Sequence, residues 1–375
     1  MQYLFELGRI PELSRAEIEH VFLAQNILST LTVYEKSILI LETPKNIDIE
    51  KIMQQLGGTI KVAEFISENT SLEAIGDYLN EVQAEGKIQF SLTGNNARDV
   101  ALQVKKYLKE LGRSVRYIEP KNTATILHNN LVEKQGDLTV TKHGLFITRG
   151  IQPIEEWGER DFGRPGRDSR SGMLPPKLAR IMINLTGAGT DGTILDPFCG
   201  SGTILTEAMS LGFAHIVGSD TSEKALDDTR KNIEWMKSQI ADTKPSTPKL
   251  ILSGAGELHG KIAQGSIDAI AAEPYMGKPL RGTEDKRTLE KQASELKELY
   301  VNAFKSFYKI LKPGSSIVFI IPRFLSDKTW IRIQCLERIQ DLGFSLERLT
   351  DTEPSILYSR PGQFVGREIW KFKKI

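Results

Sequence analysis

The chain has 375 residues, enough for two or three domains, and 40% of them are hydrophobic and 26% charged, as in ordinary globular proteins. No stretch approaches the roughly 18 apolar residues of a membrane-spanning helix, and the amphipathic, acidic start is unlike a signal or transit peptide. The two cysteines, Cys199 and Cys335, fit neither a disulfide framework nor a zinc site. We therefore expect a cytoplasmic protein with no membrane contact and no metal.

The net charge of +1 conceals an uneven distribution. Residues 1–86 hold 6 Lys and Arg against 14 Asp and Glu, whereas residues 87–150 hold 11 against 5. A local basic module is sufficient to meet nucleic-acid phosphates even in a neutral protein. This pattern is compatible with nucleic-acid binding, but ordinary solvated surface gives the same pattern.

Short strands and helices alternate through the first 150 residues, as judged from the apolar periodicity. Strands are expected over residues 3–7, 37–44, 60–66, 88–94 and 115–120, with a hairpin over 137–152. Helices are expected over residues 15–22, 47–58, 71–83 and 97–112, with a further piece ending near Lys134. Ser14 is the expected N-cap of the first helix. Residues 155–172, rich in Arg, Asp and Gly, predict a linker or an ordered loop.

From Pro175 onward, apolar strands alternate regularly with helices. Strands are expected over residues 192–198, 215–220, 250–254, 266–274 and 315–322. Helices are expected over residues 176–185, 204–212 and 223–240 and in a long segment ending near residue 314, and the tail predicts two more strands. This alternation predicts an α/β fold with a doubly wound, mostly parallel sheet. Such a sheet binds ligands at the carboxyl ends of its strands.

The sequence LDPFCGSGTILTEA (195–208) places a strand, a glycine-rich turn and a helix in immediate succession. Gly200 and Gly202 would let the backbone approach a ligand closely. Because an acid inside the turn repels pyrophosphate but attracts an ammonium or sulfonium group, Asp196 favours S-adenosylmethionine over a nucleotide. The alternative is a structural corner with incidental acids. The expected cofactor-binding residues of the turn are Asp196, Pro197, Phe198, Cys199, Gly200, Ser201, Gly202 and Thr203.

Two further strand ends are expected to contact the same cofactor. Asp220 ends the second strand 24 residues after Asp196, where a carboxylate accepts hydrogen bonds from ribose hydroxyls. The third strand ends at Gly254 and Ala255, for which we expect backbone contacts only. Cys199 has no nearby His to activate it, so a packing or backbone role is expected rather than a nucleophilic one.

The sequence SIDAIAAEPYMGKPLRG (266–282) ends an apolar strand at Glu273, followed by Pro274 and Tyr275. It is similar to the Asp/Asn-Pro-Pro-Tyr signature of methyltransferases that modify exocyclic amino groups. A carboxylate and a proline carbonyl can accept the two N–H bonds of a base amine, and an aromatic ring can stack on the extruded base. Glu replaces the usual acid here and the aromatic residue is displaced by one position. A plain strand-ending loop is the alternative.

Along nearly its whole length the sequence resembles the archaeal and eukaryotic tRNA guanosine N2-methyltransferases that modify position 10. The resemblance is carried by YLFELGRIPELSRAEIEHVF, GRSVRYIEPKN, RDFGRPGRDSRSGMLPPKLARIMINL, LDPFCGSGTILTEA, EPYMG and SRPGQFVGREI. It implies a ferredoxin-like domain (1–85), a THUMP RNA-binding domain (86–154), a linker (155–174) and a Rossmann-like methyltransferase domain (175–375). Glu273, Pro274 and Tyr275 would then be the catalytic residues.

The expected function is transfer of one or two methyl groups from S-adenosylmethionine to the N2 amine of a tRNA guanosine, at position 10. The alternatives are a guanosine elsewhere in tRNA or ribosomal RNA, a DNA adenine, and a cofactor-binding RNA scaffold without catalysis. A monomer is expected, with an activating subunit left open. Linker arginines are either phosphate contacts or paired with Glu159, Asp161 and Asp168. The expected RNA-binding residues are Arg113, Arg116, Lys121, Arg160, Arg164, Arg167 and Arg170.

Overall fold

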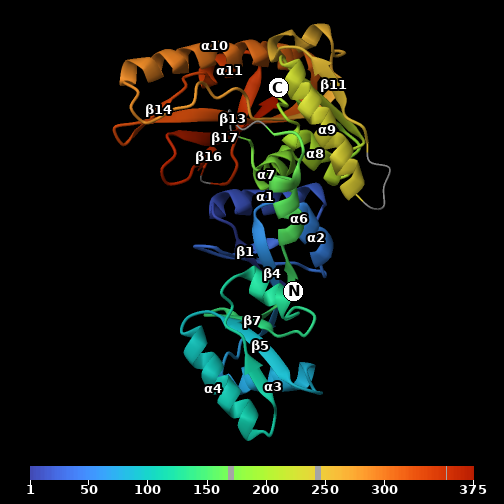
Figure 1. Cartoon of the computed structure of the whole chain (residues 1–375), viewed down its shortest axis with the longest axis vertical. Coiled ribbons are helices and arrows are strands. Elements are labelled where there is room, and N and C mark those ends of the chain that lie inside the picture. Colours follow the sequence, from blue (N-terminus) through green and yellow to red (C-terminus); the bar gives the residue numbers. More distant parts are fainter. Residues whose placement is uncertain (168–172, 241–245, 352) are drawn as a thin grey trace. The chain divides into compact units, whose positions relative to one another are not determined.

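A computed structural model describes residues 1–167, 173–240, 246–351 and 353–375 (Figure 1). The chain forms two compact units. The N-terminal unit contains residues 1–11 and 26–155, and the C-terminal unit contains residues 12–25 and 156–375. In the part of the chain that is described, no helix is both long enough and apolar enough to cross a membrane.

The N-terminal unit is built on one sheet with the strand order β2-β3-β1-β4-β8-β7-β5-β6. Its strands are β1 (Gln2–Leu7), β2 (Thr30–Glu35), β3 (Ile38–Glu42), β4 (Thr59–Ser67), β5 (Ile88–Thr93), β6 (Val115–Tyr117), β7 (Asp137–Thr141) and β8 (Gly144–Ile151). Its helices are α2 (Ile49–Gln55), α3 (Leu72–Val82), α4 (Ala97–Glu110) and α5 (Thr123–His128). The predicted boundary at residues 85/86 is not a break in this sheet, because β4 pairs with β8. The assignment of the two halves to ferredoxin-like and THUMP domains stays a prediction.

A buried polar cluster lies in the middle of this sheet. The carboxylate of Asp137 accepts hydrogen bonds from Ser91 (2.5 Å) and Thr148 (2.6 Å) and pairs with the ammonium of Lys61 (3.2 Å). Asp137 is 0% and Lys61 2% exposed. Because a buried charge is tolerated only when it is paired and hydrogen-bonded, the cluster links β4, β5, β7 and β8 in one register.

Helix α1 (Pro11–Ala24) belongs to the C-terminal unit over residues 12–24, although it follows β1 directly. Its Glu17 accepts a hydrogen bond from Asn184 (2.7 Å), and Arg15 pairs with Asp351 (3.2 Å). The prediction that Ser14 caps this helix is wrong, since the helix begins at Pro11 and Ser14 is buried inside it. Proline at the first helical position costs no hydrogen bond and sets the start of the helix.

The C-terminal unit contains a sheet with the order β11-β10-β9-β12-β13-β17-β15, with β14 beside β13 and β16 beside β17. Strands β9, β10, β11, β12 and β13 run parallel to one another, and β17 is antiparallel to β13. The strands are β9 (Thr193–Asp196), β10 (His215–Asp220), β11 (Lys249–Leu252), β12 (Ile267–Ala272), β13 (Leu311–Ser326), β14 (Thr329–Arg332), β15 (Phe344–Glu347), β16 (Ser355–Tyr358) and β17 (Val365–Lys374). The predicted doubly wound fold is confirmed, but the tail has three described strands where two were expected.

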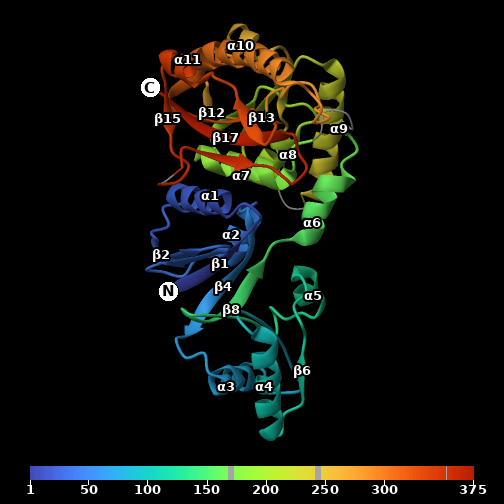
Figure 2. The same ribbon diagram turned by 90° about the vertical axis from the view of Figure 1, so that its left-hand side faces the viewer.

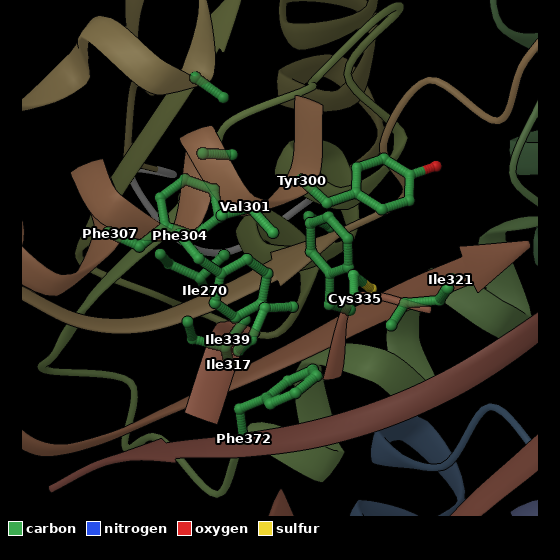
Figure 3. Close-up of a cluster of buried hydrophobic side chains, with 14 of the residues drawn as sticks. Ile270, Tyr300, Val301, Phe304, Phe307, Ile317, Ile321, Cys335, Ile339 and Phe372 are labelled. Atoms are coloured by element: carbon green, nitrogen blue, oxygen red, sulfur yellow. The ribbon is translucent and has the colours of Figure 1, made fainter. Parts of the chain in front are cut away.

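Helices cover both faces of this sheet (Figure 2). Helices α7 and α10 lie on opposite faces of β12 and β13 in both ribbon views (Figures 1 and 2). The helices are α7 (Pro176–Thr186), α8 (Thr203–Ser210), α9 (Glu223–Gln239), the short η2 (Ala255–Gly260), α10 (Lys286–Ile310) and α11 (Leu336–Asp341). Phe304 of α10 packs edge-on against Phe319, Phe344 and Phe372, at ring distances of 5.0 to 5.3 Å. Phe304 and Phe372 are labelled in Figure 3. This core fixes the strands whose ends form the candidate site.

Part of the predicted linker is helical. Residues Ile154–Gly158 form α6 and Glu159–Gly163 form a π-helix, η1. The ring of Trp157 lies 4.1 Å from the guanidinium of Arg160 and 4.9 Å from that of Arg180. Both guanidinium groups pair with Glu207 of α8. This cation–π and ion-pair cluster ties η1 to α7 and α8.

Candidate active site

Three carboxylates meet where adjacent strands end at the carboxyl edge of the C-terminal sheet. Asp196 ends β9, Asp220 ends β10, and Glu273 directly follows β12. Strand β9 lies between β10 and β12, so the chain leaves this centre in opposite directions along the sheet. A position where the strand order reverses in this way is the usual ligand site of a doubly wound sheet.

The glycine-rich turn between β9 and α8 is fixed by hydrogen bonds on both sides. The N–H of Gly200 donates to the carboxylate of Asp220 (3.0 Å), and its carbonyl accepts from the hydroxyl of Thr229 (2.7 Å). Gly202 has φ +84°, and a Cβ there would lie 2.8 Å from Thr229, so a larger residue would displace α9. Gly200 has φ +52° with open space where a Cβ would lie. A ligand can therefore approach the backbone at Gly200.

Asp196 is 3% exposed and accepts one hydrogen bond, from the N–H of Phe198 (3.0 Å). Among the described residues it has no ion-pair partner. Burial raises the pKa of its carboxyl well above the ordinary value, and the charges of Asp220 and Glu273 raise it further. A buried carboxylate of this kind favours a cationic ligand, because a positive charge would compensate for the lost hydration.

The residues predicted around Asp220 lie together at the same edge. Both carboxylate oxygens of Asp220 accept a backbone N–H, one from Gly200 and one from Ser222 (2.9 Å), which fixes the side chain. The carbonyl of Asp220 accepts from the N–H of Ser253 (3.0 Å), which places Gly254 and the buried Ala255 next to it. Each oxygen of the Asp220 carboxylate keeps a lone pair for a ligand hydroxyl.

The other predicted turn residues divide into buried and partly exposed ones. Cys199 is 5% exposed, and burial, with Asp196 next in effect, raises the pKa of its thiol well above the ordinary value. A thiol held in its neutral form agrees with the packing role predicted for Cys199. Pro197 and Thr203 are buried, whereas Phe198 and Ser201 are half-buried.

Glu273 is paired with a residue that sequence reasoning missed. The Nε of Arg367 donates to Oε1 of Glu273 at 2.5 Å, and the two side chains are 11% and 13% exposed. Burial raises the pKa of Glu273, and the charge of Arg367 opposes that rise. The resemblance included SRPGQFVGREI but gave no role to Arg367. A charged residue near the start of the last apolar strand was the signal that could have identified it.

Pro274 and Tyr275 follow Glu273 with different exposure. Pro274 is buried, whereas the side chain of Tyr275 is 55% exposed. The carbonyl of Tyr275 accepts a hydrogen bond from the hydroxyl of Tyr300 (2.7 Å), a buried residue of α10 (Figure 3). The loop is thereby held while the ring of Tyr275 remains accessible.

The predicted RNA-binding residues are not equally available. Arg113 donates to Asn80 (2.5 Å) and to the carbonyl of Gln83 (2.5 Å) within the N-terminal unit, whereas Arg116 and Lys121 are exposed. In the C-terminal unit, Arg167 is exposed and Arg170 lies outside the described residues.

Two of the linker arginines are buried. Arg160 is 7% and Arg164 2% exposed, and Arg164 donates to the hydroxyl of Thr203 at 2.6 Å. A direct phosphate contact does not fit Arg160 and Arg164, because both side chains are almost fully buried.

Two family models match the chain. One, described as an RMKL-like methyltransferase domain, matches residues 164–339, and one described as a DNA methylase matches residues 34–231. The tRNA (guanine(10)-N2)-dimethyltransferase of Methanothermobacter thermautotrophicus is 32% identical over 47% of this chain and 44% of its own length. The enzyme of that name from Pyrococcus abyssi is 26% identical over 85% of this chain and 88% of its own. The match to the first of these enzymes thus spans less than half of its length.

Solved structures show the same fold over the whole chain. TrmN from Thermus thermophilus has a TM-score of 0.56 at 18% identity, with 100% of both chains covered. A predicted N6-adenine-specific DNA methylase from Listeria monocytogenes has a TM-score of 0.51 at 12% identity, covering 100% of this chain and 97% of that one. The DNA methylase model spans more than half of the chain, and the sheet order and the acid-bearing turn agree with it. The chain therefore belongs to the family that the DNA methylase model describes, and its methyl donor is S-adenosylmethionine.

Proposed function

We propose that this protein transfers methyl groups from S-adenosylmethionine to the N2 amine of a tRNA guanosine, at position 10. The observation that carries this proposal is the placement of Glu273 beside Asp196 at the ends of neighbouring strands, close enough for its charge to raise the pKa of Asp196. One acid would face the methyl donor and the other the methyl acceptor. The names of the curated relatives, tRNA (guanine(10)-N2)-dimethyltransferases, support tRNA guanosine as the substrate.

The turn residues fit the donor chemically. Asp196, buried and without a cation, suits the positive charges of S-adenosylmethionine, and Asp220 suits its ribose hydroxyls. Gly200 leaves space for the ligand against the backbone, and Gly254 and Ala255 lie where the adenine would pass. The cofactor supplies a methyl group made electrophilic by its sulfonium.

Glu273 suits the acceptor amine. The lone pair of an exocyclic amine is delocalised into the base, so a carboxylate that accepts an N–H bond helps to direct that lone pair at the methyl carbon. As the C–N bond forms, the bond between the methyl carbon and the sulfonium sulfur would break, and S-adenosylhomocysteine would leave. The nitrogen would become positive until it passes a proton to the carboxylate of Glu273, which would also stabilise that charge. The exposed ring of Tyr275 is available to stack on the extruded base.

The exposed cations suit recognition of the RNA backbone. Arg116 lies on β6, an edge strand of the N-terminal sheet, and Lys121 follows it in the chain. With Arg167 of the C-terminal unit they are the best of the predicted phosphate contacts that the structure describes. Arg113, Arg160 and Arg164 are better explained as structural residues, since each is engaged or enclosed by its own unit.

The DNA methylase match does not favour a DNA substrate. It ends at residue 231, so it covers the glycine-rich turn, Asp196 and Asp220 but not Glu273, the residue proposed to hold the acceptor. A guanosine elsewhere in tRNA or in ribosomal RNA would present the same amine and is an outcome of the test.

The test is to incubate the full chain with labelled S-adenosylmethionine and unmodified tRNA, ribosomal RNA or duplex DNA. Digestion to nucleosides should give labelled N2-methylguanosine from tRNA alone, and sequencing should place it at position 10. Labelled N6-methyladenosine in DNA, or no label in any nucleic acid despite cofactor binding, would contradict the proposal.

A further inference from the structure

We propose that Arg367 is a positioning residue for methyl transfer, which fixes one oxygen of Glu273 and leaves the other to accept the target amine. This inference rests on the function proposed above. Among the described residues, Arg367 is the one side chain that donates a hydrogen bond to Glu273, through Nε to Oε1. No described side chain donates to Oε2, so that oxygen is available to a ligand.

The sheet brings Arg367 to this place by reversing the direction of the last strand. Strand β12 pairs in parallel with β13, and Ala272, its last residue, lies beside Phe319. Strand β17 is antiparallel to β13, with Trp370 beside Phe319 and Arg367 beside Pro322. The start of β17 therefore lies beyond the carboxyl end of β12, where Glu273 begins the loop.

The local chemistry requires such a partner. The charge of Glu273 acts on Asp196 of β9 and on Tyr300 of α10 and raises the pKa of both groups. The hydroxyl of Tyr300 is already engaged, since it donates to the carbonyl of Tyr275. Without Arg367, burial would favour the protonated form of Glu273. A protonated carboxyl would be a poorer acceptor for the amine and could not stabilise the positive nitrogen of the transition state.

The pair also accommodates the longer side chain at this position. Glu has one more rotatable bond than the Asp or Asn of the related signature, and a free side chain would sample several rotamers. Holding Oε1 on Arg367, whose side chain is 11% exposed, restricts the carboxylate to one placement. The second oxygen is then presented to the amine at little further entropic cost.

The test compares pH–rate profiles of wild-type protein, Arg367→Lys and Arg367→Met with tRNA as substrate, from about pH 5 to 9. We expect Arg367→Met to shift the acid limb of kcat upward by about 1 pH unit or more, since an adjacent Arg lowers a carboxyl pKa by roughly 1 to 3 units. Below the raised pKa, activity should fall by up to about tenfold for each unit of the shift, and it should recover at higher pH. Arg367→Lys should keep most of the wild-type pH–rate profile. KM for S-adenosylmethionine should be unchanged in both variants.

The matched control is Arg323→Met on the same strand pair. Arg323 forms a bidentate pair with Glu368, to which Ser355 also donates, and it does not contact Glu273. We expect the control to lower stability without moving the acid limb. A uniform loss of rate at every pH in Arg367→Met, or the same profile as the control, would overturn the positioning role.

A second measurement separates this inference from the proposed function. A double-mutant cycle on the free energy of unfolding, with Glu273→Gln and Arg367→Met, measures the coupling of the pair without any substrate. Coupling below the error of the measurement would overturn the pairing even if methyl transfer is observed. Clear coupling in a protein that methylates no tRNA would overturn the proposed function, and the positioning role with it, while the pair stands.

Discussion

Arg367 pairs with Glu273 across 94 residues of sequence, from an antiparallel strand to the loop that ends a parallel one. The contact joins the start of β17 to the carboxyl end of β12, so the tail of the chain forms one side of the candidate acceptor site. The turn around Gly200 forms the other side. Donor and acceptor chemistry are thereby provided by different segments of one sheet.

Replacing Glu273 should separate methyl transfer from cofactor binding. We expect Glu273→Ala to lower kcat by at least about a hundredfold, because the amine loses its acceptor, while affinity for S-adenosylmethionine stays within a few-fold of wild type. Single-turnover transfer to tRNA and calorimetric titration with the cofactor measure the two effects. Retained turnover in this variant would move the acceptor role to another residue.

Asp196→Asn should stabilise the free protein and weaken cofactor binding. The pKa of Asp196 is raised by folding, so its ionised form opposes the folded state at neutral pH, and that cost is about 1.4 kcal/mol for each unit of the rise. A neutral amide removes this cost but also removes the charge that would attract the cofactor. Thermal unfolding without ligand should occur at a higher temperature than in wild type.

The same Asp196→Asn variant should bind S-adenosylmethionine at least about tenfold more weakly. S-adenosylhomocysteine, which lacks the sulfonium charge, should lose less affinity and serves as the control ligand. A variant that is less stable than wild type, or that binds both ligands as wild type does, would contradict this assignment.

His20 of α1 should make the protein sensitive to mild acid. Burial, and next the charge of Lys371, lower the pKa of His20 from 6.5 to about 4. The unfolded chain takes up a proton on His20 near pH 6.5, and the folded chain does so only near pH 4. Protonation therefore favours the unfolded chain, so the free energy of unfolding is fully retained above pH 6.5 and decreases as the pH falls from 6.5 to 4. This decrease is on the order of 3 kcal/mol at most.

The His20→Gln variant tests this pH dependence. Between pH 7 and 4, denaturant unfolding of His20→Gln should lose less free energy than wild type loses. Parallel pH curves for the two proteins would show that His20 is not responsible. Because α1 packs in the C-terminal unit, the measurement should use the full chain and not a fragment that begins near residue 170.

Sequence reasoning found the candidate donor site because its signals are local. An apolar strand that ends in an acid predicts a side chain at the carboxyl edge of a parallel sheet, and Asp196, Asp220 and Glu273 do lie at that edge. Arg367 was missed because its position depends on the antiparallel pairing of β17 with β13. That pairing follows from the order of the whole sheet, which periodicity within one strand does not contain.

The sequence also did not show which charged side chains the fold buries. Arg160 was a reasonable phosphate contact by composition, yet its guanidinium stacks on Trp157 and pairs with Glu207. A charge pattern indicates how many cations a segment has but not which of them the fold encloses. The sequence likewise did not show with which unit α1 packs. Its apolar face packs in the C-terminal unit, although β1, just before it, belongs to the N-terminal unit.

The exposed cations of the N-terminal unit should set the salt dependence of tRNA binding. Each phosphate contact releases condensed counterions, so the slope of log K against log salt is about −0.7 to −0.9 per contact. We expect the double substitution of Arg116 and Lys121 by Ala to weaken tRNA binding and to flatten this slope by roughly 1.5, if each residue meets one phosphate. Affinity for S-adenosylmethionine should not change, because the candidate cofactor residues all lie in the C-terminal unit.

The matched control removes two exposed lysines, Lys45 and Lys51, from the acidic segment of the same unit. The control changes the net charge by the same amount, so an effect of overall charge alone would flatten both slopes equally. Arg113→Ala should instead lower stability, because its guanidinium donates to Asn80 and to the carbonyl of Gln83. An unchanged slope in the Arg116 and Lys121 variant would show that both are solvated surface residues. The exposed Arg167 would then be the next residue to titrate, as Arg167→Ala under the same salt series.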